Sequence, residues 1–494
     1  MKLITPIQFA LPMSAKQMAI ANAIDAGKSV SVDACAGSGK THTANYCTYN
    51  YSERVELIPF AKSLRLEQTE KFSQLSHVNV SNFHQRGNRM CRARKVDEKK
   101  VINIAKNLFD KSGLKVAELT KYLKVEGYGI YKDAMTVDAI ATKYGIRISE
   151  SEEDACGMSI DEMAIKVLEA SDADTDTIDF EDQLRFPVLY NKSAMLPKDC
   201  LVVLDEVQDF SPNAFCFVTN CLVSPSHQVL MIGDPSRQAL MQFAGASVEL
   251  FNIMSDYFGC VRMELDENRR CAKAIVNAAP YKGNMVALED APEGVVESMS
   301  EADVIASICD GMHPHDAVLS ETNAPILKLG IKLITSGVPV RMRTNKLESL
   351  LFRYAYKHIV NRNMKVGEMS IALRDELAER VEDGGNVSEF ADFIKCIEAL
   401  EVYCLSNGIL KSGYKNRRPV HPLQQALEIL TSGTEGITLM TGHTSKGLEW
   451  NTVFHLPTAQ KAAEQDWQAH QNQCLAHVIA TRAKMRFVTL QDGE

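Results

Sequence analysis

The stretch Val32-Asp-Ala-Cys-Ala-Gly-Ser-Gly-Lys-Thr-His-Thr43 decides the fold that we expect for this chain. An apolar run ending at Val32 predicts a strand, a glycine-rich turn follows, and the residues after Lys40 suit a helix. Gly37 and Gly39 can adopt backbone angles that other residues avoid, so successive N–H groups of the turn can point at one phosphate chain. The stretch therefore predicts a strand, a phosphate loop and a helix whose N-terminus lies behind the phosphates.

In such a loop the Lys40 ammonium is expected on the β- and γ-phosphates, and the Thr41 hydroxyl on Mg²⁺. The usual pattern has glycine at the position of Ala34, so the loop alone also fits an ordinary glycine-containing turn. An acidic partner elsewhere in the chain is needed to decide between these two interpretations.

That partner follows a second apolar strand, in the segment Leu201-Val-Val-Leu-Asp-Glu-Val-Gln-Asp209. Asp205 is placed to hold Mg²⁺ through water, and Glu206 to orient and deprotonate an attacking water molecule. A third apolar strand, Gln228 to Asp234, is followed by Gln238, whose amide could sense a γ-phosphate. The loop and the acidic pair together predict a Mg-nucleotide site.

The composition is that of an ordinary water-soluble globular protein, with 45% hydrophobic and 24% charged residues. A chain of 494 residues should hold several domains, because single hydrophobic cores stop growing at roughly 250–300 residues. Neither a charged-then-apolar N-terminal leader nor an apolar run of membrane-spanning length is visible. We therefore expect an intracellular, cytoplasmic protein with no membrane partner.

The cysteines and the charges argue against two other classes of protein. The 13 cysteines are odd in number and include no C-x-x-C pair, so buried free thiols are expected rather than disulfides or a metal site. The net charge of −9 argues mildly against a protein that binds nucleic acid over its whole surface. A local basic stretch, Arg86 to Lys100, fits either a nucleic-acid contact or a solvated helix face.

Strands that alternate with helices predict two α/β cores with parallel sheets, whose ligands lie at the carboxyl ends of the strands. The predicted strands are 30–32, 55–60, 78–80, 201–205, 228–234 and 261–265 in the first core, and 317–320, 338–341, 436–441, 452–456 and 486–490 in the second. We expect Ser14 to cap the first helix and a last helix to hold residues 481–483. The expected domains are 1–84 with 185–262, a helical insertion at 85–184, a second core at 263–345 with 434–494, and its helical insertion at 346–433.

The ordered motifs resemble those of the UvrD/Rep-type superfamily 1 DNA helicases, from Gln17 to Ala483. The segment Phe60-Ala-Lys-Ser63 is similar to the second motif of the F-box DNA helicase branch. The resemblance implies two RecA-like P-loop cores, each with a helical insertion, and ATP and Mg²⁺ as cofactors. It also implies that arginines of the second core reach a triphosphate held by the first.

The resemblance further implies three groups of site residues. Those that touch the nucleotide are Gln17 as the adenine reader, Ala36, Gly37, Ser38, Gly39, Lys40 and Thr41 of the loop, and Glu449. Those with a catalytic role are Lys40, Asp205, Glu206, Gln238 and the arginine fingers Arg270 and Arg482, with Thr41 and Asp205 at the metal. Those on a DNA track are Phe60, His84, Phe243, Thr441, His443 and Ser445, while Phe83 is expected in the core.

The chain departs from the family pattern in the third motif, in one insertion and in the sixth motif, where Gln471-Asn472 replaces the usual acidic pair and His477 replaces tyrosine. Between Asp234 and Gln238 it has one residue more than the usual spacing. Met241 stands where the family has tyrosine, and Ala244 where it has arginine, which weakens the expected base-stacking and phosphate contacts. The insertion at 346–433 is also short for the family.

The expected activity is ATP-dependent translocation 3′ to 5′ on single-stranded DNA with duplex unwinding, in replication, repair or recombination. Tailed or forked duplexes and replication or recombination proteins are the implied partners, and a monomer is expected. An alternative, favoured by the altered third motif and the short insertion, is a DNA-stimulated ATPase that remodels or loads proteins with little unwinding. RNA also stays open as the track, because base stacking discriminates weakly between sugars.

Overall fold

The computed structural model describes residues 12–60, 62–91, 95–109, 113–148, 153, 156–311, 314–343, 347, 365–382, 388–415, 418–458 and 465–491. The contacts divide the chain into two compact units. Unit 1 comprises Met1–Arg269 and Gly283–Val286, and unit 2 comprises Arg270–Lys282 and Ala287–Glu494. The sequence placed the start of the second core at 263, whereas unit 1 runs on to Arg269.

Unit 1 is built on a six-stranded sheet in the order β3-β2-β6-β7-β1-β8, with every neighbouring pair parallel. Its strands are β1 (Val30–Ala34), β2 (Arg54–Ile58), β3 (Val78–Val80), β6 (Cys200–Asp205), β7 (Gln228–Gly233) and β8 (Val261–Leu265). All six predicted strands of the first core are confirmed. Because the strands are parallel, the segments that follow β1, β6 and β7 emerge at the same carboxyl edge.

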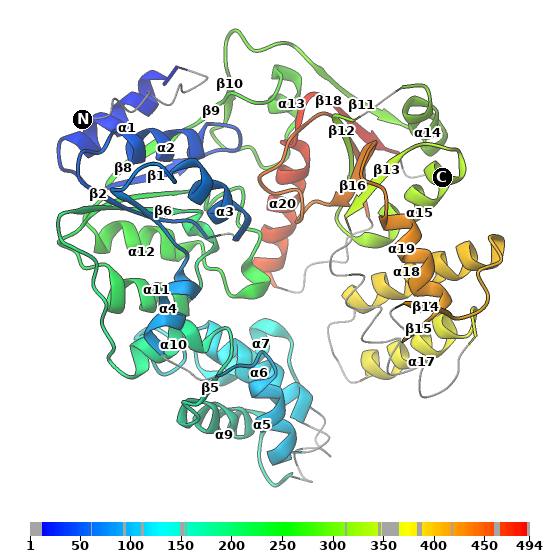
Figure 1. Cartoon of the computed structure of the whole chain (residues 1–494), viewed down its shortest axis with the longest axis horizontal. Coiled ribbons are helices and arrows are strands. Elements are labelled where there is room, and N and C mark those ends of the chain that lie inside the picture. Colours follow the sequence, from blue (N-terminus) through cyan, green and yellow to red (C-terminus); the bar gives the residue numbers. More distant parts are fainter. Residues whose placement is uncertain are drawn as a thin grey trace. The chain divides into compact units, whose positions relative to one another are not determined.

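Helices cover both faces of this sheet, which explains the unbroken apolar runs of its central strands. In β6, Leu201 and Val203 point into one apolar cluster, and Val202 and Leu204 into another. The first face is covered by α1 (Ala15–Asp25), α2 (Lys40–Asn50) and α3 (Lys62–Lys71), and the second by α11 (Pro212–Phe217) and α12 (Glu249–Tyr257), as Figure 1 shows.

The first helical insertion has an apolar core of its own, separate from the clusters on the sheet. Its elements, with the preceding helix, are α4 (Phe83–Cys91), α5 (Lys100–Phe109), α6 (Gly113–Val125), α7 (Val137–Tyr144), α9 (Ile160–Ala173) and α10 (Asp182–Leu189). A short parallel pair, β4 (Lys95–Val96) with β5 (Thr177–Ile178), was not predicted, since two residues give no periodicity. The α10 backbone packs closely on α4 at Gly87, where a Cβ would meet the Gln183 carbonyl at 1.9 Å.

Unit 2 contains the second six-stranded sheet, in the order β11-β18-β17-β12-β16-β13 and again parallel throughout. Its strands are β11 (Val295–Met299), β12 (Asp316–Ser320), β13 (Val340–Arg343), β16 (Ile437–Thr441), β17 (Trp450–Leu456) and β18 (Ala483–Leu490). Five were predicted. The edge strand β11 was missed because much of it is exposed and it carries no long apolar run.

The helices of residues 365–431 share one apolar core with the second sheet, unlike the insertion of unit 1. Phe393, Leu400 and Leu427 belong to the same cluster as Val318 and Leu439 of the strands. The remaining elements of unit 2 are α13 (Lys273–Ala278), α14 (Glu301–Cys309), α15 (Asn323–Thr335), α17 (Met369–Glu382), α18 (Ser388–Ser406), α19 (Pro422–Thr431), α20 (Asp466–Ala480), and the antiparallel β14 (Gly413–Lys415) and β15 (Arg418–Val420).

One expectation about the last helix was wrong. α20 ends at Ala480, so Thr481 and Arg482 lie in the turn between α20 and β18 and not within a helix. The hydrogen bond from the Thr481 N–H to the His477 carbonyl closes the last helical turn. The α/β class with two parallel-sheet cores, as expected for RecA-like domains, is confirmed. Within the described residues, no helix is both long and apolar enough to cross a membrane.

Candidate functional site

The phosphate loop connects β1 to α2, and residues that follow β8 hold its backbone from outside. The Asn268 amide donates to the Ala36 carbonyl at 2.8 Å, and the Arg269 N–H donates to the Gly37 carbonyl at 2.9 Å. Asn268 is fully buried, in β9 (Glu267–Asn268), which pairs with β10 (Val286–Ala287). The loop carbonyls are thus engaged away from the place where phosphates are expected.

Gln17 completes this support from helix α1. Its Oε1 accepts from the Ser14 N–H at 2.9 Å, and its Nε2 donates to the Ser38 carbonyl at 3.2 Å. The predicted Ser14 cap is confirmed as a capping box with Gln17. Gln17 is 1% exposed, so in this conformation its amide supports the loop. Its adenine-reading role stays a prediction, which would use the second lone pair and second N–H that an amide retains.

Both loop glycines adopt the left-handed conformation, with φ of 67° at Gly37 and 86° at Gly39, as the sequence predicted. A Cβ on Gly39 would lie 2.5 Å from the Gln17 Nε2, so a side chain at this position would displace the Gln17 amide from the loop. Gly39 is the N-cap of the 11-residue helix α2, and no side chain caps that end. An uncapped helix N-terminus behind a glycine turn fits a phosphate group.

Lys40 and Thr41 begin α2 at this loop. The Lys40 Nζ donates to the Ala34 carbonyl at 3.3 Å, so the ammonium spans the loop from one end to the other. Among the described residues there is no group of three or more His, Cys, Asp or Glu side chains that could hold a metal. The carboxylate of Asp205 and the hydroxyl of Thr41 would nevertheless form the small protein ligand set that suits Mg²⁺ if phosphate and water oxygens supplied the other ligands.

The acidic pair lies at the carboxyl edge of the same sheet, where β6 ends. Asp205 is 3% exposed, and its Oδ1 accepts from the Glu206 N–H at 2.9 Å. Glu206 adopts φ 55° and ψ 44°, a left-handed conformation that is costly for a side-chain-bearing residue. Such strain persists where the surrounding structure imposes it and is common at functional positions. The backbone conformation of Glu206 therefore indicates a functional position independently of the sequence motif.

A chain of hydrogen bonds leads from Glu206 to the third predicted motif. The Gln208 amide donates to Glu206, and its Oε1 accepts from the Asp234 N–H at 3.1 Å. The Gln238 Nε2 donates to the Asp234 Oδ2 at 2.6 Å, and Gln238 is 3% exposed. Phe243 lies half-buried in the short turn that follows, at Gln242–Ala244.

In unit 2, two predicted nucleotide residues contact each other. The Arg270 Nε lies 2.6 Å from the Glu449 Oε2, and the Arg270 Nη1 donates to the Thr481 carbonyl at 3.2 Å. The Lys484 Nζ lies 2.6 Å from the Glu449 Oε1. Burial raises the pKa of Glu449, but Lys484 and Arg270 outweigh this and lower the pKa, so the carboxylate stays ionised.

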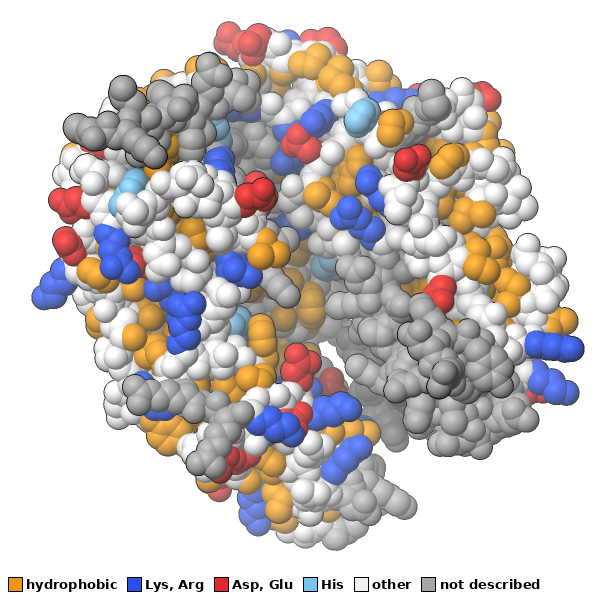
Figure 2. Space-filling model, in the orientation of Figure 1, with side chains coloured by type: hydrophobic (Ala, Val, Ile, Leu, Met, Phe, Trp, Pro, Cys, Tyr) orange, Lys and Arg blue, Asp and Glu red, His pale blue; other side chains and the backbone are white. Residues whose placement is uncertain are grey.

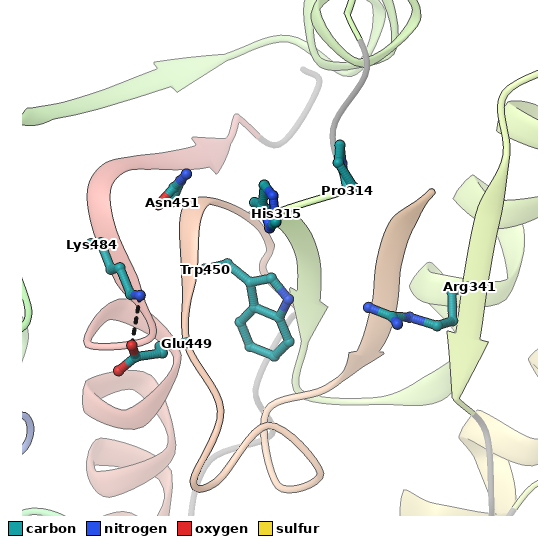
Figure 3. A pocket seen from close by; sticks show the side chains of 7 residues that line it. All are labelled: Pro314, His315, Arg341, Glu449, Trp450, Asn451 and Lys484. Carbon is teal, nitrogen blue, oxygen red and sulfur yellow. Dashed lines mark ion pairs between the residues drawn. The ribbon is translucent and has the colours of Figure 1, made fainter. Parts of the chain in front are cut away.

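Lys484 was missed by the sequence analysis, because only its contact with Glu449 distinguishes it from a surface lysine. It also lines a pocket of about 400 Å³ at the amino ends of β12, β17 and β18. The indole of Trp450 and the guanidinium of Arg341 face the same space (Figure 3). The pocket is lined by Pro314, His315, Arg341, Glu449, Trp450, Asn451 and Lys484.

Arg482 is 2% exposed, and its guanidinium is bonded inside unit 2. Its Nε donates to the Val478 carbonyl at 3.0 Å, and its Nη1 to the Leu448 carbonyl at 3.2 Å. In this conformation Arg482 ties the end of α20 to the loop that carries Glu449. Its role as an arginine finger stays a prediction.

The aromatic residues predicted near DNA in unit 1 differ in exposure. Phe83 is 2% exposed and packs edge-on against Phe210 at 4.8 Å, which confirms its expected place in the core. Phe60 is half-buried and stacks on Phe210 at 6.1 Å. His84 stacks on Phe180 with ring centroids 3.6 Å apart, and Phe180 is 49% exposed. An exposed aromatic stack of this kind can receive a nucleobase.

Phe180 was not singled out from the sequence, since it lies in an acidic stretch with few apolar residues. The turn that carries Phe180 is held by hydrogen bonds and ion pairs of its two aspartates, Asp179 and Asp182. The Asp182 N–H donates to the Asp179 Oδ1 at 2.9 Å, and the Asp179 N–H donates to the Asp182 Oδ2 at 3.1 Å. The fully buried Lys124 ammonium lies 2.6 Å from both carboxylates, so Phe180 projects from a fixed turn.

The predicted DNA residues of unit 2 follow β16, at the carboxyl edge of the second sheet. Thr441 is the last residue of β16, and its hydroxyl lies 3.0 Å from that of Thr444. His443 is half-buried. Ser445 is fully buried, and its hydroxyl donates to the Gly442 carbonyl at 2.7 Å, so in this conformation it supports the turn. Its direct contact with DNA stays a prediction.

Some basic side chains of residues 86–100 form ion pairs with buried carboxylates of the same unit. Arg86 lies 2.6 Å from the buried carboxylate of Glu56, and Lys100 is buried 2.9 Å from Asp182. Arg92 and Arg94 lie outside the described residues. On the face shown in Figure 2, basic and acidic side chains are interspersed over the described surface. Among the described residues of this stretch, Arg86 and Lys100 are therefore occupied by internal ion pairs, whereas Arg89, Lys95 and Lys99 are exposed.

Comparisons with known proteins add little to these observations. No protein-family model matches the chain, and no curated protein matches it. Among solved structures, the crystal structure of an arterivirus nonstructural protein 10, a helicase, matches with a TM-score of 0.34 and 10% sequence identity. The match covers 96% of this chain and 61% of that one, so the chain spans about three-fifths of the viral helicase's length.

The surroundings of His84 give a prediction about pH. Burial lowers the pKa of His84 to about 4, although hydrogen bonds with the Phe180 backbone and the Gln183 side chain oppose this. The unfolded chain, with a histidine pKa of about 6.5, therefore binds the proton more readily, and acidification from pH 6.5 towards 4 destabilises the fold. We expect the His84 ring signal in NMR, assigned with His84→Gln, to stay that of neutral imidazole down to about pH 4. A titration midpoint near 6.5 would contradict the burial of the His84 ring.

Proposed function

We propose that this chain is a Mg-ATP-dependent DNA motor of the UvrD/Rep superfamily 1 type, which moves 3′ to 5′ on single strands and unwinds duplex. The observation that supports this most is that the phosphate loop, with Gly37 and Gly39 in the left-handed conformation, lies at the same sheet edge as the acidic pair Asp205-Glu206. The direction of movement rests on the resemblance of the motifs alone.

The chemistry assigned to unit 1 is phosphoryl transfer to water. The loop N–H groups and Lys40 bind the phosphates, and Thr41 and Asp205 hold Mg²⁺, which neutralises charge on the transferred phosphoryl group. Glu206 takes the proton of the attacking water, and its hydrogen bond from Gln208 fixes the carboxylate for that task. Gln238 reports on the γ-phosphate.

The arginines of unit 2 complete the proposed site. Arg270 exchanges Glu449 for the γ-phosphate, and Lys484 keeps one oxygen of Glu449 paired during that exchange. Arg482 supplies the second positive charge. Because these groups belong to unit 2 and Lys40 to unit 1, hydrolysis couples to movement of one unit against the other. For this function we retain the division into two cores with insertions at 85–184 and 346–433.

The proposed track for DNA consists of aromatic and small polar side chains. Stacking on an aromatic face tolerates every base, as a motor that reads no sequence requires. In unit 1 these side chains are Phe60, Phe243 and the stacked pair His84 and Phe180, and in unit 2 they are Thr441, His443 and Ser445. Replication, repair or recombination is the proposed setting, with forked or tailed duplexes as substrates and a monomer as the working unit.

The nucleotide assignment is tested with two substitutions. Lys40→Ala and Glu206→Gln should each lower ATP turnover by about 10²–10⁴-fold, because one removes phosphate charge stabilisation and the other the general base. Glu206→Gln should still bind ATP, measured with a fluorescent analogue. Lys28→Ala and Glu70→Gln change exposed residues of the same unit and should leave turnover intact. Undiminished hydrolysis in either site variant would overturn the assignment.

The aromatic track is tested at Phe180. Phe180→Ala should weaken single-stranded DNA binding by about 5- to 150-fold, the effect of losing one stacked base at 1–3 kcal/mol, without changing the salt dependence. Phe180→Trp should bind as the native protein does. Tyr257→Ala removes an aromatic of unit 1 that is 37% exposed and serves as the control. Fluorescence anisotropy with a labelled oligonucleotide measures all three, and equal losses for Phe180→Ala and Tyr257→Ala would refute the stack as a DNA contact.

A second candidate is a DNA-stimulated ATPase that loads or remodels proteins and unwinds little. Met241 and Ala244 favour it, because they replace the aromatic and the cation expected in the third motif. Strand displacement on 3′-tailed and 5′-tailed duplexes distinguishes the two, and we expect displacement of the 3′-tailed substrate only. ATPase that is stimulated by single strands without displacement would favour the second candidate, and no stimulation by DNA or RNA would exclude both.

A further inference from the structure

Arg237 belongs to the residues between Asp234 and Gln238, where this chain is one residue longer than the family spacing. Its side chain is only 4% exposed, and its guanidinium makes three directed contacts within unit 1. The Nε donates to the Asp234 Oδ1 at 2.8 Å, the Nη2 to the Asp33 Oδ1 at 2.8 Å, and the Nη1 to the Asn284 Oδ1 at 2.5 Å. A single planar cation therefore bridges three separate segments of the chain.

Two of these segments belong to the proposed nucleotide site. Asp33 lies in β1, directly ahead of the phosphate loop, and Asp234 carries Gln238 on its other carboxylate oxygen. Burial and the neighbouring Asp234 raise the pKa of Asp33, against the effect of the Arg237 charge. The positive charge of Arg237 thus offsets the repulsion between the carboxylates of Asp33 and Asp234. Asp234 also accepts a hydrogen bond from Gln238, the residue assigned to sense the γ-phosphate.

The third segment is a short stretch of unit 1 that is flanked on both sides, along the chain, by residues of unit 2. Asn284 lies in Gly283–Val286, which belongs to unit 1 while Lys282 and Ala287 on either side belong to unit 2. The Asn284 Nδ2 also donates to the Glu264 Oε2 on β8 at 2.9 Å. Asn284 thus holds this connecting segment against the first sheet through Glu264 and Arg237, in addition to the hydrogen bond from the Val286 N–H to the Asp266 carbonyl.

We propose that Arg237 is a positioning residue that couples the occupancy of the phosphate loop to the connecting segment Gly283–Val286. The inference rests on the proposed nucleotide site. When Gln238 leaves Asp234 for the γ-phosphate, Arg237 becomes the main partner of that carboxylate, and its guanidinium shifts the Asn284 contact. A planar fork with fixed donor directions is needed for a three-way contact of this kind, so lysine cannot replace it.

Two variants separate this coupling from simple support of the fold. Asn284→Ala removes the acceptor of the hydrogen bond between Arg237 and the connecting segment, and it changes neither the phosphate loop nor Gln238. Arg237→Lys keeps the charge between Asp33 and Asp234 but loses the fork. Arg262→Lys is the matched control, because Arg262 makes an ion pair with Asp256 in the same unit, where both side chains are exposed.

The experiment is hydrogen–deuterium exchange with and without a non-hydrolysable ATP analogue and Mg²⁺. In the native protein we expect the analogue to slow exchange in residues 282–288 at least threefold. In Asn284→Ala and Arg237→Lys the analogue should bind with an affinity within about fivefold of native, yet slow exchange in that segment by less than half as much. Arg262→Lys should behave as the native protein.

The outcomes distinguish the inference from the function on which it rests. Failure of the native protein to bind the analogue would overturn the proposed function. Binding without an exchange response in residues 282–288, or an undiminished response in Asn284→Ala, would overturn the coupling alone. Should Arg237→Lys fold poorly, Asn284→Ala decides the question by itself.

Discussion

The carbonyl groups of the phosphate loop are held by residues distant in the chain, and the rest of the candidate site depends on this constraint. Asn268 and the Arg269 backbone arrive from the segment after β8, and Gln17 arrives from α1. A glycine-rich turn has many accessible conformations, so these contacts reduce the entropy that a phosphate would otherwise have to remove. The shape of the loop therefore depends on the pairing of β8 with β1 at the edge of the sheet, which brings Asn268 and Arg269 to the loop.

Much of this architecture is readable from the sequence because the central strands are buried on both faces. An unbroken apolar run such as Leu201 to Leu204 is typical of a central strand whose sheet is covered on both faces. The left-handed glycines and the Ser14 cap were also predictable, since each depends on local backbone chemistry. The α/β class and eleven of its strands follow from such local signals, whereas the exposed edge strand β11 offers none.

The parts that could not be predicted are those defined by contacts between distant residues. Lys484 becomes notable only through Glu449, and Phe180 only through His84. Conversely, Ser445 and Arg482 belong to the stretches that resemble helicase motifs but lie buried in their own unit, which no single sequence reveals.

The division of the chain into units has a consequence for any attempt to take the protein apart. The polypeptide passes between the units at 269/270, 282/283 and 286/287. Each unit therefore includes one short segment that is separated in sequence from the rest of that unit: Gly283–Val286 for unit 1 and Arg270–Lys282 for unit 2. A single cut within residues 270–282 would give two fragments, each keeping a segment that completes the other's unit. Halves expressed independently after such a cut would consequently each lack a piece of their own unit.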